Sequence, residues 1–441
     1  MSRILIALGL TAAALSQPTA AALAQQADKA APAGETAFDR RAGQLVDLFA
    51  GRLVYADYFA PTFEQAVPEA QFKTLAANLI AQYGQPVAVE SMNPLGDRRG
   101  TVALRFEKAV GTVALSVESG PDQRVDGLRI QNFEMANDSF EAAAAELAAL
   151  PGNTGFLVAE IDGATIRAVA GAHQDEQFAV GSTFKLYVLD ELAAQVAAGE
   201  RRWDDVVPLS HLSFSSAATA GWPQDTPVTL QTLANWMISV SDNGAADTLI
   251  HLLGRERIEA RMRAAGNSDP SRNIPFLTTV EAFALKGDNF ASQREAFLAA
   301  DDSAQRRVLA DNRDRLILAN VDGASFGGKP RFIDSLEWFA SPTDVARAMI
   351  DLKGRGSPQA MAAMAINSGV GPAAAADWRY LGYKGGSELG VLSMSLLGQR
   401  KSDGKWFVVT ASWNNPDGDA AAETMTGLVA RLLALAAKSR S

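Results

Sequence analysis

The stretch "AVGSTFKLYVLDEL", residues 179–192, carries the residues that decide the fold. Ser182 opens a predicted helix, and Lys185 follows three positions later. Residues three apart in a helix share a face, so the lysine amine can reach the serine hydroxyl. A serine needs an adjacent base to act as a nucleophile, and a lysine is such a base only when burial or a neighbouring cation lowers its pKa. The pattern also fits a capped helix with a surface lysine, because serine is a common N-cap residue.

Two further segments favour the catalytic interpretation. "SDN", residues 241–243, lies between two predicted helices that are marked by apolar stripes. "KGGS", residues 384–387, lies at the predicted entrance to a strand. Taken singly, Asn243 also fits a helix N-cap and the lysine–glycine segment a turn. The three segments together, in this order and on these types of element, are typical of serine enzymes that form acyl intermediates.

On these three segments, residues 138–438 resemble the class A β-lactamases and the penicillin-binding proteins that share their fold. The resemblance implies that Ser182 is the acylated nucleophile and that Lys185 takes its proton. It implies that Ser241 relays a proton to the leaving nitrogen, helped by Lys384. Asn243 would bind the side-chain amide of the substrate.

The same resemblance assigns substrate binding to the segment Gly386–Ser387. The backbone N–H groups of Ser182 and Ser387 would form the oxyanion hole, and Lys384 with Ser387 would hold the substrate carboxylate. Gly385 stands where the family usually has threonine, so we expect Ser387 to supply the missing hydroxyl. Lys384 would also be the second cation that lowers the pKa of the lysine base.

One expected feature of efficient class A enzymes is missing. Their Glu-x-x-x-Asn arrangement, which activates the water that frees the acyl group, is absent from residues 266–287. The nearest acid, Glu281, follows Thr278 by three positions and predicts a capping box; a role in deacylation is the alternative. Residues 281–338 are extra sequence, which we expect to form a mainly helical elaboration near the site. Acylation is therefore expected, and the acyl-enzyme is expected to persist.

Composition excludes several other classes of function. The 441 residues carry a net charge of −10 and show no basic stripe interleaved with aromatic residues, which excludes a nucleic-acid partner. No cysteine is present, so disulfides, a thiolate nucleophile and cysteine-bound metal are excluded. His173, His211 and His251 lack the spacing of metal ligands. We expect no metal and no other cofactor.

The first residues, "MSRILIALGLTAAALSQPTAAALAQQ", predict export. Arg3 precedes an apolar run that is too short to span a bilayer, and Ala22–Ala24 fits the small-residue rule for cleavage. We expect a signal peptide over residues 1–24, a linker over 25–36, and a bacterial periplasmic or secreted protein. No later segment predicts a membrane helix, and we expect a monomer.

The remaining chain predicts two α+β domains. Residues 37–136 predict a small domain in which helices at 38–53 and from Pro68 to Gly84 precede a curled antiparallel meander. Residues 138–438 predict one antiparallel sheet with an all-helical subdomain inserted into it. The predicted elements of this domain are a helix to residue 150 with a capping box of Asp138 and Glu141, a hairpin over 156–171, a helical region over 182–350, strands after Tyr380 with a turn at 403–404, and a helix over 421–437.

The pairing of these domains resembles a two-domain β-lactamase-like protein encoded with clavulanic acid biosynthesis genes. That likeness implies a weak or altered hydrolase with esterase activity. We therefore expect an exported serine hydrolase whose substrate is a β-lactam or another small acyl compound. The alternatives are a D,D-peptidase, an esterase, a sensor that is acylated once, and a protein whose N-terminal domain binds the functional ligand.

Overall fold

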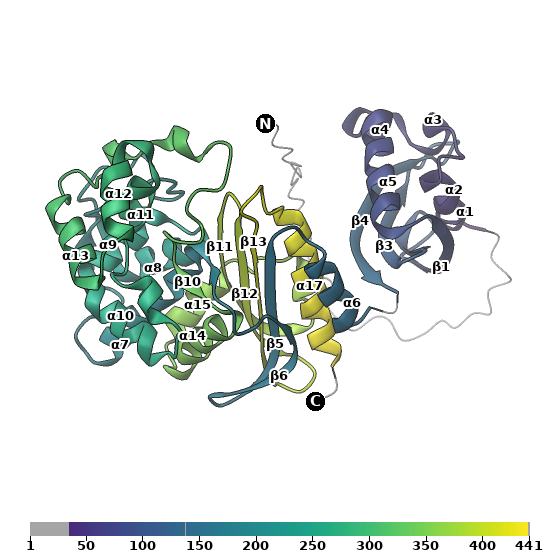
Figure 1. Cartoon of the computed structure of the whole chain (residues 1–441). Helices are drawn as coiled ribbons and strands as arrows, with labels where there is room; N and C mark the ends of the chain where they lie inside the picture. Colours follow the sequence, from purple (N-terminus) through teal and green to yellow (C-terminus); the bar gives the residue numbers. More distant parts are fainter. Residues whose placement is uncertain (1–34, 137, 440–441) are drawn as a thin grey trace. The chain divides into compact units, whose positions relative to one another are not determined.

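The computed structural model describes residues 35–136 and 138–439, and the signal peptide expected over residues 1–24 lies outside them. The chain divides between Ala136 and Asn137 into two compact units (Figure 1). Each unit has its own apolar core. No helix within the described ranges has the length and apolar character needed to cross a membrane.

The first unit packs helices against an antiparallel four-stranded sheet of order β1-β2-β3-β4. Phe38, Phe59, Phe72 and Phe106 are fully or almost fully buried in its core. The helices are α1 (Ala37–Gly43), α2 (Leu45–Phe49), α3 (Tyr55–Tyr58), α4 (Pro61–Ala66) and α5 (Glu69–Tyr83). The strands are β1 (Pro86–Pro94), β2 (Arg99–Phe106), β3 (Ala109–Val117) and β4 (Val125–Met135).

One prediction for this unit is wrong in detail, and one strand was not predicted. The single helix predicted over 38–53 is two short helices, because the first ends at Gly43, a residue that favours a helix end. Strand β1 was not predicted, because irregularities in its pairing with β2 break the strict alternation of apolar residues that marks a strand. The helix expected from Pro68 is correct, since Pro68 is the N-cap of α5 and Gly84, with a φ of 81°, follows its last residue.

The second unit is built on an antiparallel five-stranded sheet of order β11-β12-β13-β5-β6. Strand β13 pairs with β5, so the hairpin near the start of the unit joins the strands near its end, as predicted. Gly163, with a φ of 61°, forms the hairpin turn. The strands are β5 (Asn153–Asp162), β6 (Thr165–Ala172), β11 (Trp378–Glu388), β12 (Val391–Arg400) and β13 (Trp406–Asn414).

Helices cover both faces of this sheet (Figure 1). Helices α6 (Phe140–Ala148) and α17 (Ala422–Lys438) cover one face and bury an apolar layer against it. The capping box predicted for α6 is wrong: Ser139 is the N-cap, and Asp138 instead pairs with Arg431 of α17 at 2.8 Å.

The helical subdomain and the larger core lie on the other face. Its helices are α7 (Lys185–Ala197), α8 (Leu230–Ser239), α9 (Asn243–Leu253), α10 (Arg255–Ala264), α11 (Thr279–Lys286), α12 (Ala291–Leu298), α13 (Asp302–Asp311), α14 (Pro342–Gly354), α15 (Pro358–Ala365) and α16 (Pro372–Ala375). Two short strand pairs complete the unit: β7 (Phe178–Ala179) with β10 (Phe339–Ala340), and β8 (Val206–Pro208) with β9 (Pro227–Thr229). The extra sequence over 281–338, predicted to be mainly helical, is α-helical only up to Asp311, and residues 312–338 hold only two short 3-10 turns, Leu318–Asn320 and Gly323–Phe326.

Candidate active site

Ser182 lies in a 3-10 turn, η1 (Gly181–Phe184), which runs directly into helix α7 at Lys185. The α-helix was expected to begin at the serine, but it begins one turn later. Residues three apart eclipse each other in a 3-10 turn, so Ser182 and Lys185 still lie on the same side. Ser182 is half-buried, whereas the side chain of Lys185 is completely buried.

The amine of Lys185 connects the end of η1 to the segment Ser241–Asn243. Its Nζ donates to the backbone oxygen of Ser241 at 2.6 Å and to Asn243 Oδ1 at 2.6 Å, and it lies 3.3 Å from Ser241 Oγ. Among the described residues, no side-chain hydrogen bond joins Lys185 to Ser182, because the amine is turned toward these two partners. Catalytic hydrogen bonds are often long before substrate binds, so this geometry is compatible with proton transfer from the serine.

A second buried lysine reaches the same hydroxyl. Lys384 Nζ lies 3.1 Å from Ser241 Oγ and also donates to the backbone oxygen of Gly385. Ser241 has a φ of 58°, in the left-handed region that residues with a side chain seldom adopt. Such strain persists only where surrounding contacts hold it, and it concentrates at functional sites. Lys384 lies inside strand β11, and not at its entrance as predicted, because the strand already begins at Trp378.

Burial lowers the pKa of both amines. Burial lowers the pKa of Lys185 to about 7, against the opposing effect of Asp247 and Asp242, whose negative charges favour the protonated form. Burial, followed by the charge of Lys185, lowers the pKa of Lys384 well below its usual value. The expectation that Lys384 is what lowers the pKa of Lys185 is therefore corrected: desolvation acts on Lys185, and the repulsion between the amines is felt at Lys384.

The backbone of β11 packs directly on the turn that carries the serine. A Cβ added to Gly386 would lie 2.5 Å from Ser182 N and 2.0 Å from the backbone oxygen of Val180, so only glycine allows this approach. A Cβ added to Gly181 would lie 3.1 Å from Ser387 N. The backbone nitrogens of Ser182 and Ser387 therefore both lie at this close contact between the turn and strand β11.

Asn243 is held on both sides of its amide. Its Oδ1 accepts from Lys185, and its Nδ2 donates to the backbone oxygen of Phe214 at 2.8 Å. Only 5% of its surface is exposed. Asn243 thus orients the amine of Lys185, and a substrate amide would have to share or displace one of these bonds.

Asp242 is a positioning residue that was not identified from the sequence. It is the N-cap of α9, a role considered for Asn243, and it accepts from Ala245 N at 2.8 Å. Its other oxygen accepts from three successive backbone N–H groups, those of Ala217, Ala218 and Thr219, at 2.7–3.0 Å. Asp242 thus fixes the loop that supplies the Phe214 carbonyl, an interaction between distant segments that no local pattern predicts.

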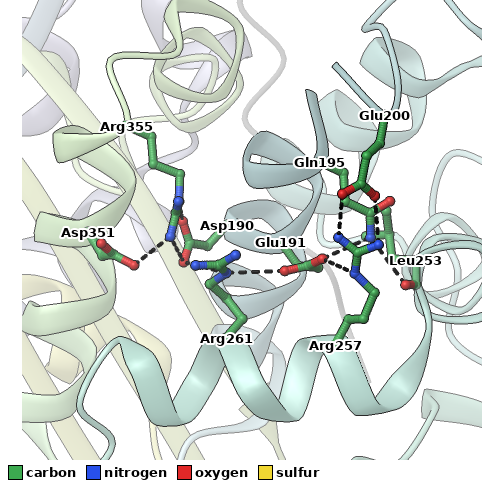
Figure 2. Close-up of polar contacts among 9 residues, drawn as sticks. All are labelled: Asp190, Glu191, Gln195, Glu200, Leu253, Arg257, Arg261, Asp351 and Arg355. Atoms are coloured by element: carbon green, nitrogen blue, oxygen red, sulfur yellow. Dashed lines mark hydrogen bonds and ion pairs between the residues drawn. The ribbon is translucent and has the colours of Figure 1, made fainter. Parts of the chain in front are cut away.

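Helix α7, which follows the serine turn, is fixed from its far side by an ion network (Figure 2). Glu191 accepts from Arg257 at 2.8 Å and from Arg261 at 3.1 Å, both on α10. Arg355, at the end of α14, binds both Asp190 and Asp351, the latter at 2.7 Å. Asp190 and Glu191 are almost fully buried, so their pairing with arginines offsets a large desolvation cost and ties three helices together.

Glu281 takes no part in this cluster of side chains. It forms the predicted capping box with Thr278, and its carboxylate accepts a hydrogen bond from the backbone N–H of Thr278 at 2.8 Å. Its two oxygens also accept hydrogen bonds from the guanidinium group of Arg255 at 2.7 and 2.9 Å. The prediction of a capping role is confirmed. Both oxygens of the carboxylate are engaged by these partners, which leaves the alternative role in deacylation without a supporting contact.

The histidines are placed as structural groups. The rings of His211 and His251 stack with centroids 3.7 Å apart, and burial lowers the pKa of both, that of His251 to about 4. His173 is exposed beside Glu176. In the part of the chain that the structure describes, no group of three or more histidine or carboxylate side chains is arranged to hold a metal ion.

The chain was compared with solved structures and with curated proteins. The chain is similar to a solved β-lactamase structure from Sphaerobacter thermophilus, with 20% sequence identity, coverage of 68% of this chain and 97% of that one, and a TM-score of 0.45. It is also similar to a β-lactamase structure from Xanthomonas campestris, with 18% identity, coverage of 66% of this chain and 95% of that one, and a TM-score of 0.45. A structure of PBP-A is also similar, with 14% sequence identity, coverage of 66% of this chain and 93% of that one, and a TM-score of 0.45. A search of curated proteins finds no match.

The family model described as the β-lactamase enzyme family matches residues 139–365, just over half of the 441 residues. The match begins where the second compact unit begins and includes Ser182, Lys185 and Ser241–Asn243. The predicted fold class is thereby confirmed, with the helices and meander of residues 35–136 as an additional N-terminal region. The chain belongs to the β-lactamase enzyme family.

Proposed function

We propose that the second unit is a serine hydrolase that opens the amide of a β-lactam through a covalent acyl-enzyme on Ser182. The observation that carries this proposal is the convergence of two buried lysines on one hydroxyl, with Ser241 Oγ 3.3 Å from Lys185 Nζ and 3.1 Å from Lys384 Nζ. Two desolvated amines at a shared hydroxyl form a proton relay, and the serine turn directly precedes one of them.

The contacts of Lys185 suit a base. An unprotonated amine has two N–H bonds and one lone pair, and the two 2.6 Å contacts with Ser241 O and Asn243 Oδ1 account for both N–H bonds. The lone pair takes the proton of Ser182 Oγ as that oxygen bonds to the carbonyl carbon. The N–H groups of Ser182 and Ser387 stabilise the charge that develops on the carbonyl oxygen.

The same relay serves the leaving group. Ser241 gives its proton to the leaving nitrogen as the carbon–nitrogen bond breaks, and Lys185 then returns a proton to Ser241 Oγ. Lys384 holds that hydroxyl in place from the other side. The proton removed from Ser182 thus ends on the leaving nitrogen, and the acyl group stays on the serine.

A slowly hydrolysed acyl-enzyme is the second candidate, and the contacts of Glu281 favour it. Both oxygens of this carboxylate bind Arg255. Without a free carboxylate from this loop to activate water, the acyl group would leave slowly, as in a sensor or a penicillin-binding protein. An esterase, as the likeness to the clavulanic acid cluster protein implies, would instead turn over simple esters.

The test mixes purified protein with a chromogenic cephalosporin and follows colour and intact mass together. Rapid colour with a transient adduct supports the β-lactamase, and a stoichiometric adduct without turnover supports the slow acyl-enzyme. Hydrolysis of simple esters without any adduct supports the esterase. Ser182→Ala should abolish each signal, and activity that survives this substitution would refute the mechanism.

We also propose that the protein is exported to the periplasm or secreted. The support is the sequence of residues 1–24, with its short apolar run and small-residue cleavage site. N-terminal sequencing of the mature protein should begin at Gln25; an intact Met1 on protein recovered outside the cytoplasm would contradict cleavage there.

A further inference from the structure

A pocket of about 180 Å³ opens beside the last residues of strand β11. Phe214, Phe283 and Phe326 line it together with Lys329, Arg331 and the β11 end Ser387–Leu389. The three rings are neighbours, with centroids 5.2–5.5 Å apart. We call this space the aromatic pocket.

The aromatic pocket is connected to the proposed catalytic groups at two points. Ser387 carries one of the N–H groups assigned to the oxyanion hole, and the backbone oxygen of Phe214 holds Asn243 at 2.8 Å. Lys384 and Ser241, which serve the leaving nitrogen, lie at the other end of this part of β11. A strand rises about 3.3 Å per residue, so roughly 10 Å separate Lys384 from Ser387 along it. The part of a substrate that stays on Ser182 would therefore extend toward the pocket.

The elaboration supplies one wall of the aromatic pocket and its positive charge. Phe326, Lys329 and Arg331 all come from the segment between α13 and β10. Lys329 is exposed, and no hydrogen bond or ion pair engages its amine within the described residues. Arg331 pairs with Asp288, yet its Nε is buried without a hydrogen-bond partner in the described chain.

The carboxyl group of the pocket, Glu388, does not cancel this charge. Its Oε1 lies 2.6 Å from Lys286 Nζ, which also contacts Glu337 at 2.6 Å. Burial, followed by the nearby Glu337, raises the pKa of Glu388, and the carboxyl group is already engaged by Lys286. Arg331 is balanced by Asp288, so three aromatic rings and the exposed amine of Lys329 are left to face a ligand.

We propose that the aromatic pocket binds the acyl side chain of the substrate and selects one that carries an aryl ring next to an anionic group. The inference rests on the proposed acyl-enzyme function and adds the class of substrate to it. The ring would pack among Phe214, Phe283 and Phe326, where aromatic pairs gain energy beyond simple burial. The anion would face the exposed amine of Lys329.

The experiment compares three penams that share one nucleus and differ only in the side chain: acetyl, phenylacetyl and phenylmalonyl. The second-order rate constant for acylation of Ser182 is measured for the full chain by rapid quench and intact mass. We expect the rate constant to rise from acetyl to phenylacetyl by about tenfold, since a buried ring contributes on this scale. We expect a further rise of about threefold for phenylmalonyl, since the charge interaction at an exposed lysine is weaker.

Substitutions in the aromatic pocket should change these ratios selectively. Phe326→Ala should reduce the phenylacetyl-to-acetyl ratio about tenfold, and Phe326→Leu, which keeps apolar bulk, should give an intermediate ratio. Lys329→Gln should remove the phenylmalonyl advantage of about threefold. Lys401→Gln, an exposed lysine in the turn that follows β12, is the matched control and should leave all ratios unchanged.

Each outcome separates the two proposals. Acylation of Ser182 with equal rate constants for the three penams, or with ratios that Phe326→Ala leaves intact, would overturn the pocket assignment while preserving the proposed function. Absence of acylation by every penam would overturn the proposed function and the pocket assignment with it.

Discussion

The amine of Lys185 is completely buried yet forms no ion pair with any residue in the described ranges, and its hydrogen bonds run to a backbone oxygen, an amide oxygen and a hydroxyl. Desolvation without a salt-bridge partner penalises the charged form of an amine. The pKa of Lys185 accordingly falls to about 7. At the residue scale, this supports a base that is partly unprotonated at neutral pH.

The pH dependence of acylation follows from that pKa. Below pH 7 the amine is protonated and cannot take the proton of Ser182, so the acylation rate constant should fall about tenfold per pH unit on the acid side and level off above pH 7. Stopped-flow acylation between pH 5 and 9 provides the measurement. Lys185→Arg, which stays charged, should be inactive throughout. A profile that is flat through pH 5–7 would show that another group is the base.

Gly386 offers a second test at a single residue. An added Cβ would meet backbone atoms at 2.0, 2.5 and 2.7 Å, and backbone cannot rotate away as a side chain can. Gly386→Ala should therefore reduce acylation at least a hundredfold and lower the free energy of unfolding by about 2 kcal/mol.

Gly427→Ala is the matched control for this substitution. Gly427 lies in helix α17 with nothing within 4 Å of an added Cβ, so this variant should keep full activity and gain about 0.5–1 kcal/mol in unfolding free energy. Denaturant titration and acylation rates measure both effects. Normal acylation by Gly386→Ala would refute the close approach of β11 to the serine turn.

At the element scale, helix α11 tests what Glu281 does. Glu281→Gln keeps the capping hydrogen bond but loses the ion pair with Arg255, whereas Glu281→Ala loses both. We expect the free energy of unfolding to fall by about 1 kcal/mol in the first variant and about 2 kcal/mol in the second. The rate of acyl-enzyme hydrolysis should not change in the glutamine variant. A selective loss of hydrolysis there, with acylation intact, would assign deacylation to Glu281.

Elements with strong local signals were predicted correctly from the sequence. The hairpin at Gly163, the helices on both sides of Ser241–Asn243 and the last helix, α17, each have periodic apolar residues with a defined end. The pairing of β13 with β5 could also be predicted from the sequence, because the strands near the two ends of the unit would otherwise leave backbone N–H and C=O groups unpaired at their edges.

The errors arise where long-range contacts decide the local structure. Asp138 pairs with Arg431, nearly three hundred residues away, so Ser139 caps α6 instead. Asp242 accepts hydrogen bonds from three backbone N–H groups of a loop that is distant in the sequence, so its positioning role could not be predicted from residues 241–243 alone. The structure brings the three predicted segments together, and their catalytic roles stay a prediction that rests on the spacing of Ser182 and Lys185 and on the order of the segments. The Phe214 carbonyl was missed because a backbone oxygen has no sequence signal.

At the scale of the whole molecule, the two compact units have separate cores. The aromatic core around Phe59 belongs to residues 35–136, and the residues proposed for catalysis all lie beyond residue 137. A fragment of residues 138–441 should therefore fold alone and acylate within about twofold of the full chain, since domains with their own core are independent folding units. Circular dichroism and acylation kinetics test this. A folded fragment that fails to acylate would assign part of the site to the first unit.

The central claim is that Ser182 becomes covalently acylated. The most direct measurement is peptide mapping by mass spectrometry after exposure of the full chain to a penicillin. We predict a mass increase equal to that of the whole penicillin, located at Ser182 on the peptide that also contains Lys185, and no such increase in Ser182→Ala. An adduct on any other residue, or a chain that remains unmodified by every penicillin tested, would contradict the account.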